Sequence, residues 1–458
     1  MVADLKSDVL VILAIVLFPI TLLFLSFYYV DSGLIFILLS ASILFVGYGA
    51  VCRQSIPDLI FIFVINYGVG LQVVSLFIWP EFLAYQEGVF AVVMATADAV
   101  ERSLFLLVAL NLGWGVVLIF DRCATDVSAI KGNSGDNDLS FFVKWFFLSV
   151  VALALGAVLL AVGVAGVESE FQYSGFLYYL FPADYLVLVL CVGLGLGQED
   201  FKRREIFIWS LIVVYLGVKI LSGWKSPLLN IFLAYMVGAY YRGGSGAIFR
   251  LIPLGVFVAM CYLFLVKPIV DFVRVGEWFA GVYMEELSGI NPFAGRLTEG
   301  TLFGIATIES GYGLGMIDMR DFLGDFVNRL VPGTIWDIKS IDRVFTEDVL
   351  GQQEGVASTF APGLLGMAEM LGGIGAAFLY GIFFRFLVFF LMHWINKSQF
   401  VIVKFYLLGV VPIFIVSFCI DGYFGGFERA AVIGIVLTFV LWGRSFVYQY
   451  LGSSKSPA

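Results

Sequence analysis

Long apolar runs separated by short polar breaks are the feature that most constrains how this chain folds. A helix that crosses the hydrocarbon core of a bilayer needs about 20 predominantly apolar residues. Of the 458 residues, 61% are hydrophobic and 13% are charged, against about 45–50% and about 25% in an ordinary soluble domain. The composition excludes soluble enzymes, disordered chains and secreted disulfide scaffolds. It predicts an all-α polytopic membrane protein.

The apolar runs predict twelve membrane-spanning helices. They lie near residues 8–30, 33–51, 58–80, 103–120, 145–166, 175–197, 206–222, 226–241, 250–268, 364–390, 401–420 and 430–449. Residues 1–268 would hold the first nine spans and residues 359–458 the last three. Between them, residues 269–358 form one large loop, and the whole chain is expected to be one integrated membrane domain.

The distribution of basic residues predicts the orientation of the spans, because cytoplasmic loops carry an excess of Lys and Arg. With the N-terminus in the cytoplasm, the outer short loops hold three basic residues, Arg102, Lys225 and Arg429. The inner loops and tails then hold thirteen: Lys6, Arg53, Arg122, Lys131, Lys144, Lys202, Arg203, Arg204, Arg242, Arg250, Lys397, Arg444 and Lys455. We therefore expect both termini to be cytoplasmic and the large loop to be extracytoplasmic.

The large loop carries most of the net charge of the chain. Residues 269–358 contain fourteen acidic and six basic residues, which gives −8 of the total −9. The stretches DFVRVGEWFAGVYMEELS and MRDFLGDFVNRL place apolar residues at helical spacing. We expect short helices in this loop, packed on the outer mouth of the bundle.

Several kinds of site are not indicated by the sequence. The five cysteines are scattered and His393 is the only histidine, so we expect no metal site, no cofactor and no disulfide framework. Asp136-Asn137-Asp138 has the spacing of a metal-binding motif of nucleotide-sugar transferases, but it is interpreted as a solvated turn in a short polar loop. No basic run suggests nucleic acid.

Ionisable residues within the apolar spans are candidates for function, since charge at membrane depth is costly. They are Asp184, Lys219, Glu369, Arg385 and Lys404. Lys219 and Lys404 have long stems and are expected to reach the interface, and Arg385 is expected to be an anchor near the inner end of its span. Glu369 lies near the outer face among glycines, where a segment can approach the backbone closely. It is either a general base or the partner of a nearby basic residue.

Other candidates cluster on the predicted outer side. Asp421 and Glu428 flank the glycine-rich turn DGYFGGFER, where a carboxylate can deprotonate a sugar hydroxyl. Lys225 sits in a short turn, either as a contact to a lipid-linked phosphate or as a lone interfacial lysine. The large loop adds further cations that suit phosphate oxygens or simple surface pairs; they are Arg274, Arg296, Arg320, Arg329, Lys339 and Arg343.

Three stretches resemble the Wzy-type oligosaccharide repeat-unit polymerases, which belong with O-antigen ligases among the GT-C-like membrane glycosyltransferases. The first is LSGWKSPLLNIFLAYMVGAYY at 221–241, with Lys225 where family members often have arginine. The second, at 295–340, opens on Arg296 and closes on a Val-Pro…Ile-Trp…Lys pattern that includes Trp336 and Lys339. The third, STFAPGLLGMAEMLGGIGAAFLYGIFF at 358–384, has a similar Pro…Gly…Gly pattern.

The resemblance implies an enzyme that joins undecaprenyl-diphosphate-linked repeat units into a surface polysaccharide, such as O-antigen or exopolysaccharide, on the outer face of the bacterial inner membrane. Catalysis would need neither metal nor cofactor. Implied partners are the lipid-linked glycans, membrane lipids, a chain-length regulator and a flippase. In this reading Lys225, Arg274 and Arg296 bind the diphosphate. Glu369, backed by Asp421 and Glu428, is the base, and Lys339, Arg343 and Trp336 contact glycan or phosphate.

Two other activities compete with this interpretation. A flippase for lipid-linked oligosaccharides would also use many spans, but it would carry charges along a central cavity and need only short outer loops. An O-antigen ligase would share the fold and use a different acceptor. The absence of histidine from residues 269–358 favours the polymerase over the ligase. A non-catalytic assembly protein would not need the outer cations.

Overall fold

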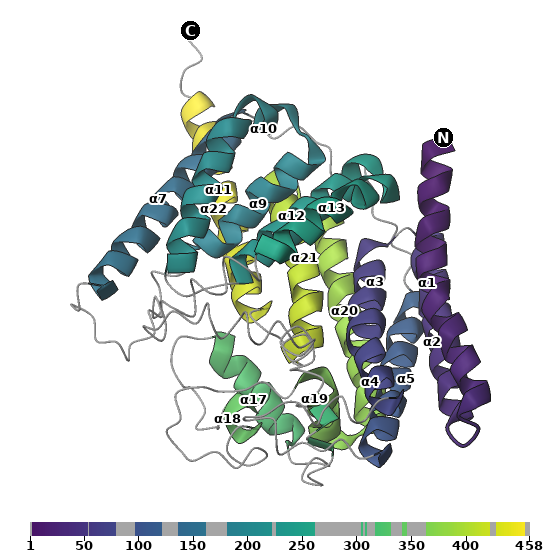
Figure 1. The fold of residues 1–458 in the computed structure, drawn as a ribbon. Coiled ribbons are helices and arrows are strands. Elements are labelled where there is room, and N and C mark those ends of the chain that lie inside the picture. Colours follow the sequence, from purple (N-terminus) through teal and green to yellow (C-terminus); the bar gives the residue numbers. More distant parts are fainter. Residues whose placement is uncertain are drawn as a thin grey trace. The chain divides into compact units, whose positions relative to one another are not determined.

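A computed structural model describes most of the predicted spans and parts of the large loop (Figure 1). The described elements are all helices, as predicted. The described residues are 2–53, 55–78, 97–120, 136–161, 181–221, 226–261, 304–305, 307–308, 317–330, 341–345, 363–421 and 427–453.

Eight of the described helical segments are long and apolar enough to cross a membrane. They are Val11–Tyr28, Gly33–Arg53, Ile56–Ile78, Asp98–Phe120, Leu139–Gly156, Ile374–Lys397, Val401–Phe418 and Ala430–Val447. Each overlaps one of the twelve predicted spans. The chain is therefore a multi-pass helical membrane protein, as the composition predicts.

The other four predicted spans also contain helices, but these helices do not reach the same length and hydropathy. They are α9 (Ala183–Leu196), α11 (Glu205–Leu221), α12 (Ser226–Gly243) and α13 (Ser245–Cys261). Helix α9 has only 14 residues, which at 1.5 Å per residue is about 21 Å and less than the hydrocarbon thickness. Twelve crossings therefore stay a prediction.

The predicted tenth span is not one helix. It divides into α19 (Gly363–Gly372) and α20 (Ile374–Lys397). Gly372 and Gly373 have φ values of 139° and 70°, a backbone region that residues with a Cβ rarely occupy. The chain therefore turns between two apolar helices, and the part long enough to cross a membrane begins ten residues later than predicted.

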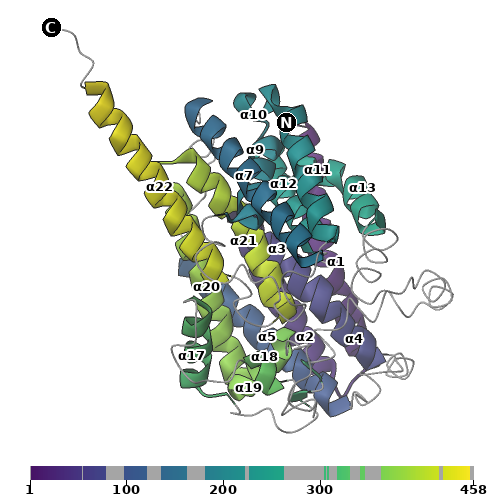
Figure 2. The same cartoon turned by 90° about the vertical axis from the view of Figure 1, so that its left-hand side faces the viewer.

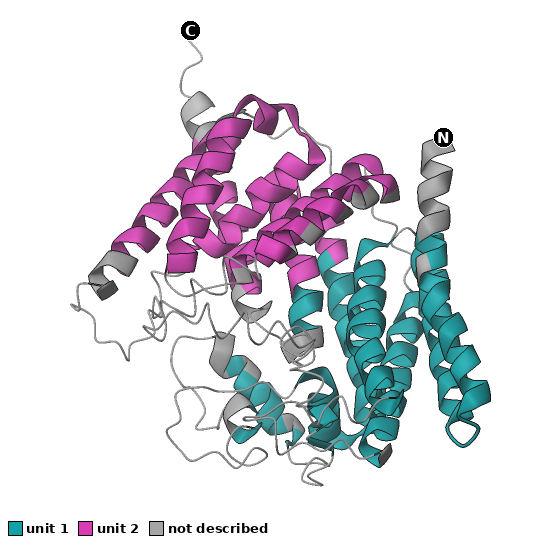
Figure 3. Cartoon of the chain, in the orientation of Figure 1, with its two compact units in different colours: residues 1–125, 280–391, 414–425 teal, residues 126–279, 392–413, 426–458 magenta. Residues whose placement is uncertain are grey.

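The chain forms two compact units (Figure 3). Unit 1 comprises residues 1–125, 280–391 and 414–425, and unit 2 comprises 126–279, 392–413 and 426–458. The unit boundaries near residues 391 and 413 fall within α20 and α21 (Val401–Asp421). The division predicted at residues 269 and 359 concerns placement in the membrane and stays a prediction.

Unit 1 is built on packed long helices. Helix α2 (Gly33–Arg53) packs against α1 (Val2–Tyr28) and α5 (Ala97–Phe120), and α5 also packs against α4 (Leu71–Ile78) and α19. A Cβ on Gly113 of α5 would collide with the carbonyl of Phe378 on α20, and a Cβ on Gly381 would collide with the carbonyl of Leu110. Glycine at both positions lets α5 and α20 touch through their backbones. Between α2 and α4 the chain forms α3 (Ile56–Phe61) and the π-helix η1 (Ile62–Gly70).

Unit 2 is arranged around the short helix α9, whose described residues are mostly buried. Helix α12 crosses α9 with extensive contact, and α7 (Asp136–Ala161) and α11 also pack against α9. The α9–α12 crossing again depends on glycine, because a Cβ on Gly195 or Gly238 would meet the backbone of the opposite helix. The remaining helices are α10 (Glu199–Arg203) and α22 (Phe427–Ser453).

Two parts of the predicted large loop are helical. Helix α17 (Met319–Leu330) covers the predicted stretch MRDFLGDFVNRL, and α18 (Ile341–Val344) follows it. The Asp318 carboxylate accepts a hydrogen bond of 2.7 Å from the Asp321 backbone N–H, which caps the start of α17. The ring of Phe322 packs edge-on against Tyr380 of α20, at 6.0 Å between centroids. The expectation of short helices in this loop is confirmed for α17 and α18, whereas DFVRVGEWFAGVYMEELS lies outside the described residues.

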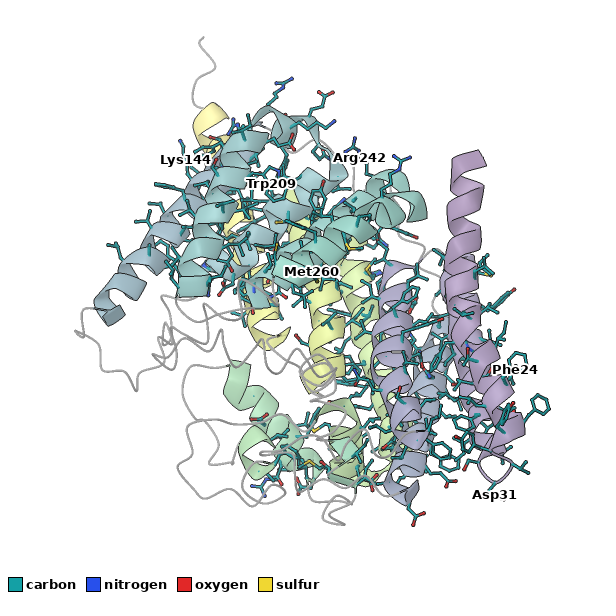
Figure 4. The ribbon with its side chains drawn as sticks, viewed as in Figure 1. Phe24, Asp31, Lys144, Trp209, Arg242 and Met260 are labelled. Carbon is teal, nitrogen blue, oxygen red and sulfur yellow. The ribbon has the colours of Figure 1, made fainter. Side chains whose placement is uncertain are left out.

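Many large apolar side chains point away from the helix packing. On α1, Leu17, Phe24 and Phe27 are 64%, 65% and 80% exposed, and Phe24 projects outward from unit 1 in Figure 4. A soluble protein does not usually expose so many large apolar side chains on its helices. A hydrocarbon environment explains it.

One sequence interpretation is wrong. Asp136-Asn137-Asp138, expected in a solvated turn, forms the first turn of α7.

Candidate functional site

Glu369 lies on the short helix α19, which the sequence places directly after the large loop. The helix starts at Gly363, whose φ is 68°, and ends at the Gly372–Gly373 turn. Residues Gly363–Met370 are all buried, and Glu369 is 3% exposed. A carboxylate so removed from water requires a charged partner or strong hydrogen bonds.

The partner of Glu369 is Arg102 on α5. The Arg102 Nε donates to Glu369 Oε1 at 2.8 Å, and Nη2 lies 2.8 Å from the same oxygen. The other carboxylate oxygen, Oε2, is buried and has no hydrogen-bond partner among the described residues. The Arg102 side chain is 36% exposed, against 5% for Glu369. The pair therefore has a buried acidic side and a more accessible basic side.

Arg102 was expected in a short outer loop, and its position in the structure differs. Helix α5 begins at Ala97, so Arg102 lies on the second turn of that helix. The predicted span started at residue 103 because the segment before it contains charged residues. Since Arg102 is helical, its side chain is held at a fixed place toward α19, which packs against α5.

Parts of the large loop pack against α19 near this ion pair. A Cβ on Gly304 would lie 2.8 Å from the Leu365 side chain and 3.0 Å from the Gly366 backbone nitrogen. The Ile317 N–H donates to the Met370 carbonyl at 3.2 Å. The close approach to the backbone expected from the glycines around Glu369 is thus found at Gly366. Figures 1 and 2 both show α17, α18 and α19 at the same end of unit 1.

The Arg102–Glu369 pair can both accept and donate hydrogen bonds to a ligand. Oxygen Oε2 of Glu369 has no donor, so it can accept a hydrogen bond or a proton from a hydroxyl group that reaches it. Arg102 uses Nε and Nη2 on one oxygen, and a guanidinium has five N–H donors in total. The other N–H groups of Arg102 have no partner among the described residues and can donate to an anion. The two side chains together suit a ligand that has both hydroxyl and phosphate groups.

Most of the other predicted site residues lie outside the part of the chain that the structure describes. This holds for Lys225, Arg274, Arg296, Trp336 and Lys339. Three more lie in described helices, with side chains outside the description: Arg343 in α18, Asp421 at the end of α21 and Glu428 at the start of α22. A common site for these residues and Glu369 stays a prediction.

A second ion pair in unit 1 is almost completely buried. Asp58 is 0% and Arg385 2% exposed. Asp58 Oδ1 lies 2.8 Å from Arg385 Nε and accepts a hydrogen bond of 2.8 Å from Trp114 Nε1, while Arg385 Nη2 donates to Oδ2 at 3.2 Å. The Arg385 guanidinium also lies 5.9 Å from the Trp114 ring centroid. The interpretation of Arg385 as an interfacial anchor is wrong, because the side chain is enclosed between α3, α5 and α20.

Unit 2 contains a third ion pair. Lys219 Nζ of α11 donates to Asp184 Oδ2 of α9 at 2.8 Å, and the Tyr215 hydroxyl donates to Asp184 Oδ1 at 2.5 Å. Lys219 is 7% exposed. Lys219 thus has a carboxylate partner on the neighbouring helix α9, and its reach to the interface stays a prediction. Lys404 is likewise buried, at 8% exposed.

A neutral polar network lies beside the π-helix η1. Asn66 and Asn111 exchange amide hydrogen bonds of 3.3 and 2.8 Å, and Asn111 also donates to Ser42 at 3.4 Å. All three residues are at most 1% exposed. The sequence interpretation missed this network, along with Asp58 and Trp114. The signal was present as polar residues within or at the edge of apolar runs, but the sequence does not show which of them meet.

Comparison of the chain with protein-family models, with curated proteins and with solved structures finds no match. The residues themselves therefore supply the grounds for any assignment of activity. What the helices establish is a multi-pass helical membrane protein.

Proposed function

We propose that this protein is a membrane glycosyltransferase that polymerises oligosaccharide repeat units carried on a lipid diphosphate. The observation that supports this most directly is the Arg102–Glu369 pair. Within the described part of the chain, it combines a carboxylate oxygen that accepts no hydrogen bond with a guanidinium that bonds only to Glu369, beside packed segments of the large loop. The resemblance of residues 221–241 and 295–384 to repeat-unit polymerases points in the same direction.

The proposed reaction needs a base and a leaving-group site, and the chain offers residues for both. Glu369 Oε2 would take the proton of an acceptor sugar hydroxyl. At the same time, the hydroxyl oxygen would form a bond to the anomeric carbon of the donor. The anomeric bond to phosphate breaks, and the lipid diphosphate departs with the electron pair. Lys225, Arg274 and Arg296 would neutralise the diphosphate, and Lys339, Arg343 and Trp336 would contact glycan or phosphate. Asp421 and Glu428 are the alternative bases.

The location of the reaction follows from the predicted orientation. The large loop and the first turns of α5 would face the extracytoplasmic side of a bacterial inner membrane. No nucleotide-sugar pool exists there, so the donor must carry its own leaving group. A lipid diphosphate meets this requirement.

The test is polymerisation by the Glu369→Gln variant. Membranes or purified protein are supplied with lipid-linked repeat units, and the product ladder is resolved on a gel. Loss of a general base typically lowers the rate by about 10²–10⁴-fold, so we expect the ladder to vanish on the time scale of the unchanged protein. Glu199→Gln is the matched control, since Glu199 is an exposed residue in the first turn of α10 and should leave the ladder intact. A normal ladder from Glu369→Gln would exclude Glu369 as the base.

A second candidate is a flippase for the same lipid-linked glycans. The observation that favours it is the Asp184–Lys219 pair with Tyr215, because paired charges among apolar helices often mark transport pathways. The polymerisation assay separates the two activities. A flippase moves its substrate across the bilayer and forms no ladder.

A further inference from the structure

The Arg102–Glu369 pair is incomplete on both sides. Both Arg102 contacts converge on Oε1, which leaves Oε2 buried without a hydrogen-bond partner in the part of the chain that the structure describes. Buried polar atoms are nearly always hydrogen-bonded, and an exception in a folded protein calls for an explanation. On the other side, Arg102 is 36% exposed and, among the described residues, bonds only to Glu369. The arrangement fits a resting state that a ligand rearranges.

Phosphate is the ligand chemistry that suits the accessible side of the pair. A guanidinium binds carboxylate and phosphate through the same planar fork of N–H groups. A phosphate oxygen that reaches the exposed part of Arg102 therefore competes with Glu369 for the same donors. Glu369, at 5% side-chain exposure, cannot turn to water as an alternative partner.

We propose that Arg102 exchanges Glu369 for the diphosphate of the lipid-linked donor, and that this exchange makes Glu369 available as the base. The inference rests on the proposed function and adds a regulatory step to it. The positive charge of Arg102 opposes protonation of the carboxylate, so moving that charge toward phosphate favours proton transfer to Glu369. The base becomes active only when the donor is bound. An idle site therefore does not activate water as a competing acceptor.

The exchange has a signature that a purely structural ion pair lacks. If Glu369 and phosphate compete for Arg102, removing the Glu369 charge must strengthen phosphate binding while it stops turnover. Removing the Arg102 charge must weaken phosphate binding. A structural pair would affect folding stability in both variants and leave phosphate binding by the folded protein unchanged.

The experiment measures binding to the full-length protein in detergent micelles. The probes are undecaprenyl diphosphate, inorganic diphosphate and phosphatidylglycerol. We expect Glu369→Gln to bind undecaprenyl diphosphate about tenfold more tightly than the unchanged protein and Arg102→Gln about tenfold more weakly. The double variant should bind as weakly as Arg102→Gln. Thermal unfolding in the same micelles reports whether each variant is folded.

Arg53→Gln is the matched control for loss of a positive charge. The Arg53 Nη2 donates to the Ile119 carbonyl at 3.3 Å, near the other end of α5. Ile119 is 17 residues from Arg102, which is about 25 Å along the helix. This variant should bind undecaprenyl diphosphate as the unchanged protein does. Arg102→Lys keeps the positive charge but removes the planar fork of N–H groups. Its affinity for undecaprenyl diphosphate should lie between those of the unchanged protein and Arg102→Gln.

The outcomes separate this inference from the proposed function. Unchanged or weaker binding by folded Glu369→Gln overturns the exchange, whatever the polymerisation assay shows. A response to phosphatidylglycerol alone also overturns it, because the site would then recognise bulk lipid. A parallel response to inorganic diphosphate supports the exchange and assigns it to the phosphate groups. If the variants show the predicted binding changes but the unchanged protein forms no glycan ladder, the exchange is supported and the polymerase is rejected.

Discussion

Charged side chains within the apolar helices are held in pairs with specific geometry. Three ion pairs have an N···O distance of 2.8 Å: Arg385–Asp58, Lys219–Asp184 and Arg102–Glu369. A single charge in such surroundings is strongly unfavourable, and its opposite partner offsets much of that penalty. Loss of one partner should therefore be more harmful than loss of both.

The Asp58–Arg385 pair allows the sharpest test at the residue scale. We expect Arg385→Gln to lower the free energy of unfolding by about 3–5 kcal/mol, because Asp58 stays as a buried carboxylate without its cation. The double variant Asp58→Asn/Arg385→Gln should lose clearly less, since neither charge remains. Denaturation of the purified protein in detergent micelles measures both.

Arg53→Gln serves as the control here as well, because Arg53 lies at a helix end and its substitution should change stability by no more than about 0.5 kcal/mol. Equal losses in the single and double variants would show that the pairing of charge is not what matters. The Trp114 hydrogen bond to Asp58 would then be the first alternative to examine.

Among the elements, the packing of α5 on α20 depends on glycine at the crossing. We expect Gly381→Ala to destabilise the protein by about 1–3 kcal/mol, because its methyl group would meet the Leu110 carbonyl of α5. Backbone atoms of a packed helix cannot give way as a flexible side chain can. Thermal unfolding in micelles and the yield of folded protein in membranes are the measurements.

Gly375→Ala is the matched control for this substitution. Gly375 lies on the same helix, and a Cβ there meets nothing within 4 Å. Since alanine is favoured over glycine in a helix by about 1 kcal/mol, Gly375→Ala should be neutral or stabilising. If the two variants behave alike, close backbone contact between α5 and α20 is not important for stability.

The sequence predicted the positions of the elements better than their ends. Helices α1, α2, α21 and α22 overlap their predicted spans because a long apolar run fixes where a chain can lie in hydrocarbon. The division of residues 364–390 into α19 and α20 was not foreseen. Apolar glycines leave the hydrophobic run unbroken, so hydropathy does not reveal that Gly372 and Gly373 adopt positive φ.

For the whole molecule, the distribution of basic residues predicts orientation. A reporter fused after Leu330, at the end of α17, should be extracytoplasmic, and one fused after Ser453, at the end of α22, should be cytoplasmic. Alkaline phosphatase, which is active only outside the cytoplasm, and a fluorescent protein that matures only inside give opposite readings. Phosphatase activity at Ser453 would contradict the predicted orientation. The same side for both fusions would contradict the three spans predicted between them, because an odd number of crossings places the two ends on opposite sides.

The sequence alone determined that this is an all-helical, multi-pass membrane protein, and it singled out Glu369 as an unusual carboxylate. Those conclusions depend on the length of the apolar runs and on the cost of placing a charge within them, and neither depends on how the helices pack. The pairing of Arg102 with Glu369 becomes visible only in the folded chain, since the two residues are 267 positions apart. An ion pair in an apolar medium forms wherever helix packing brings opposite charges together. That packing is set by contacts, such as the glycine crossing of α5 and α20, that leave no periodic trace in the sequence.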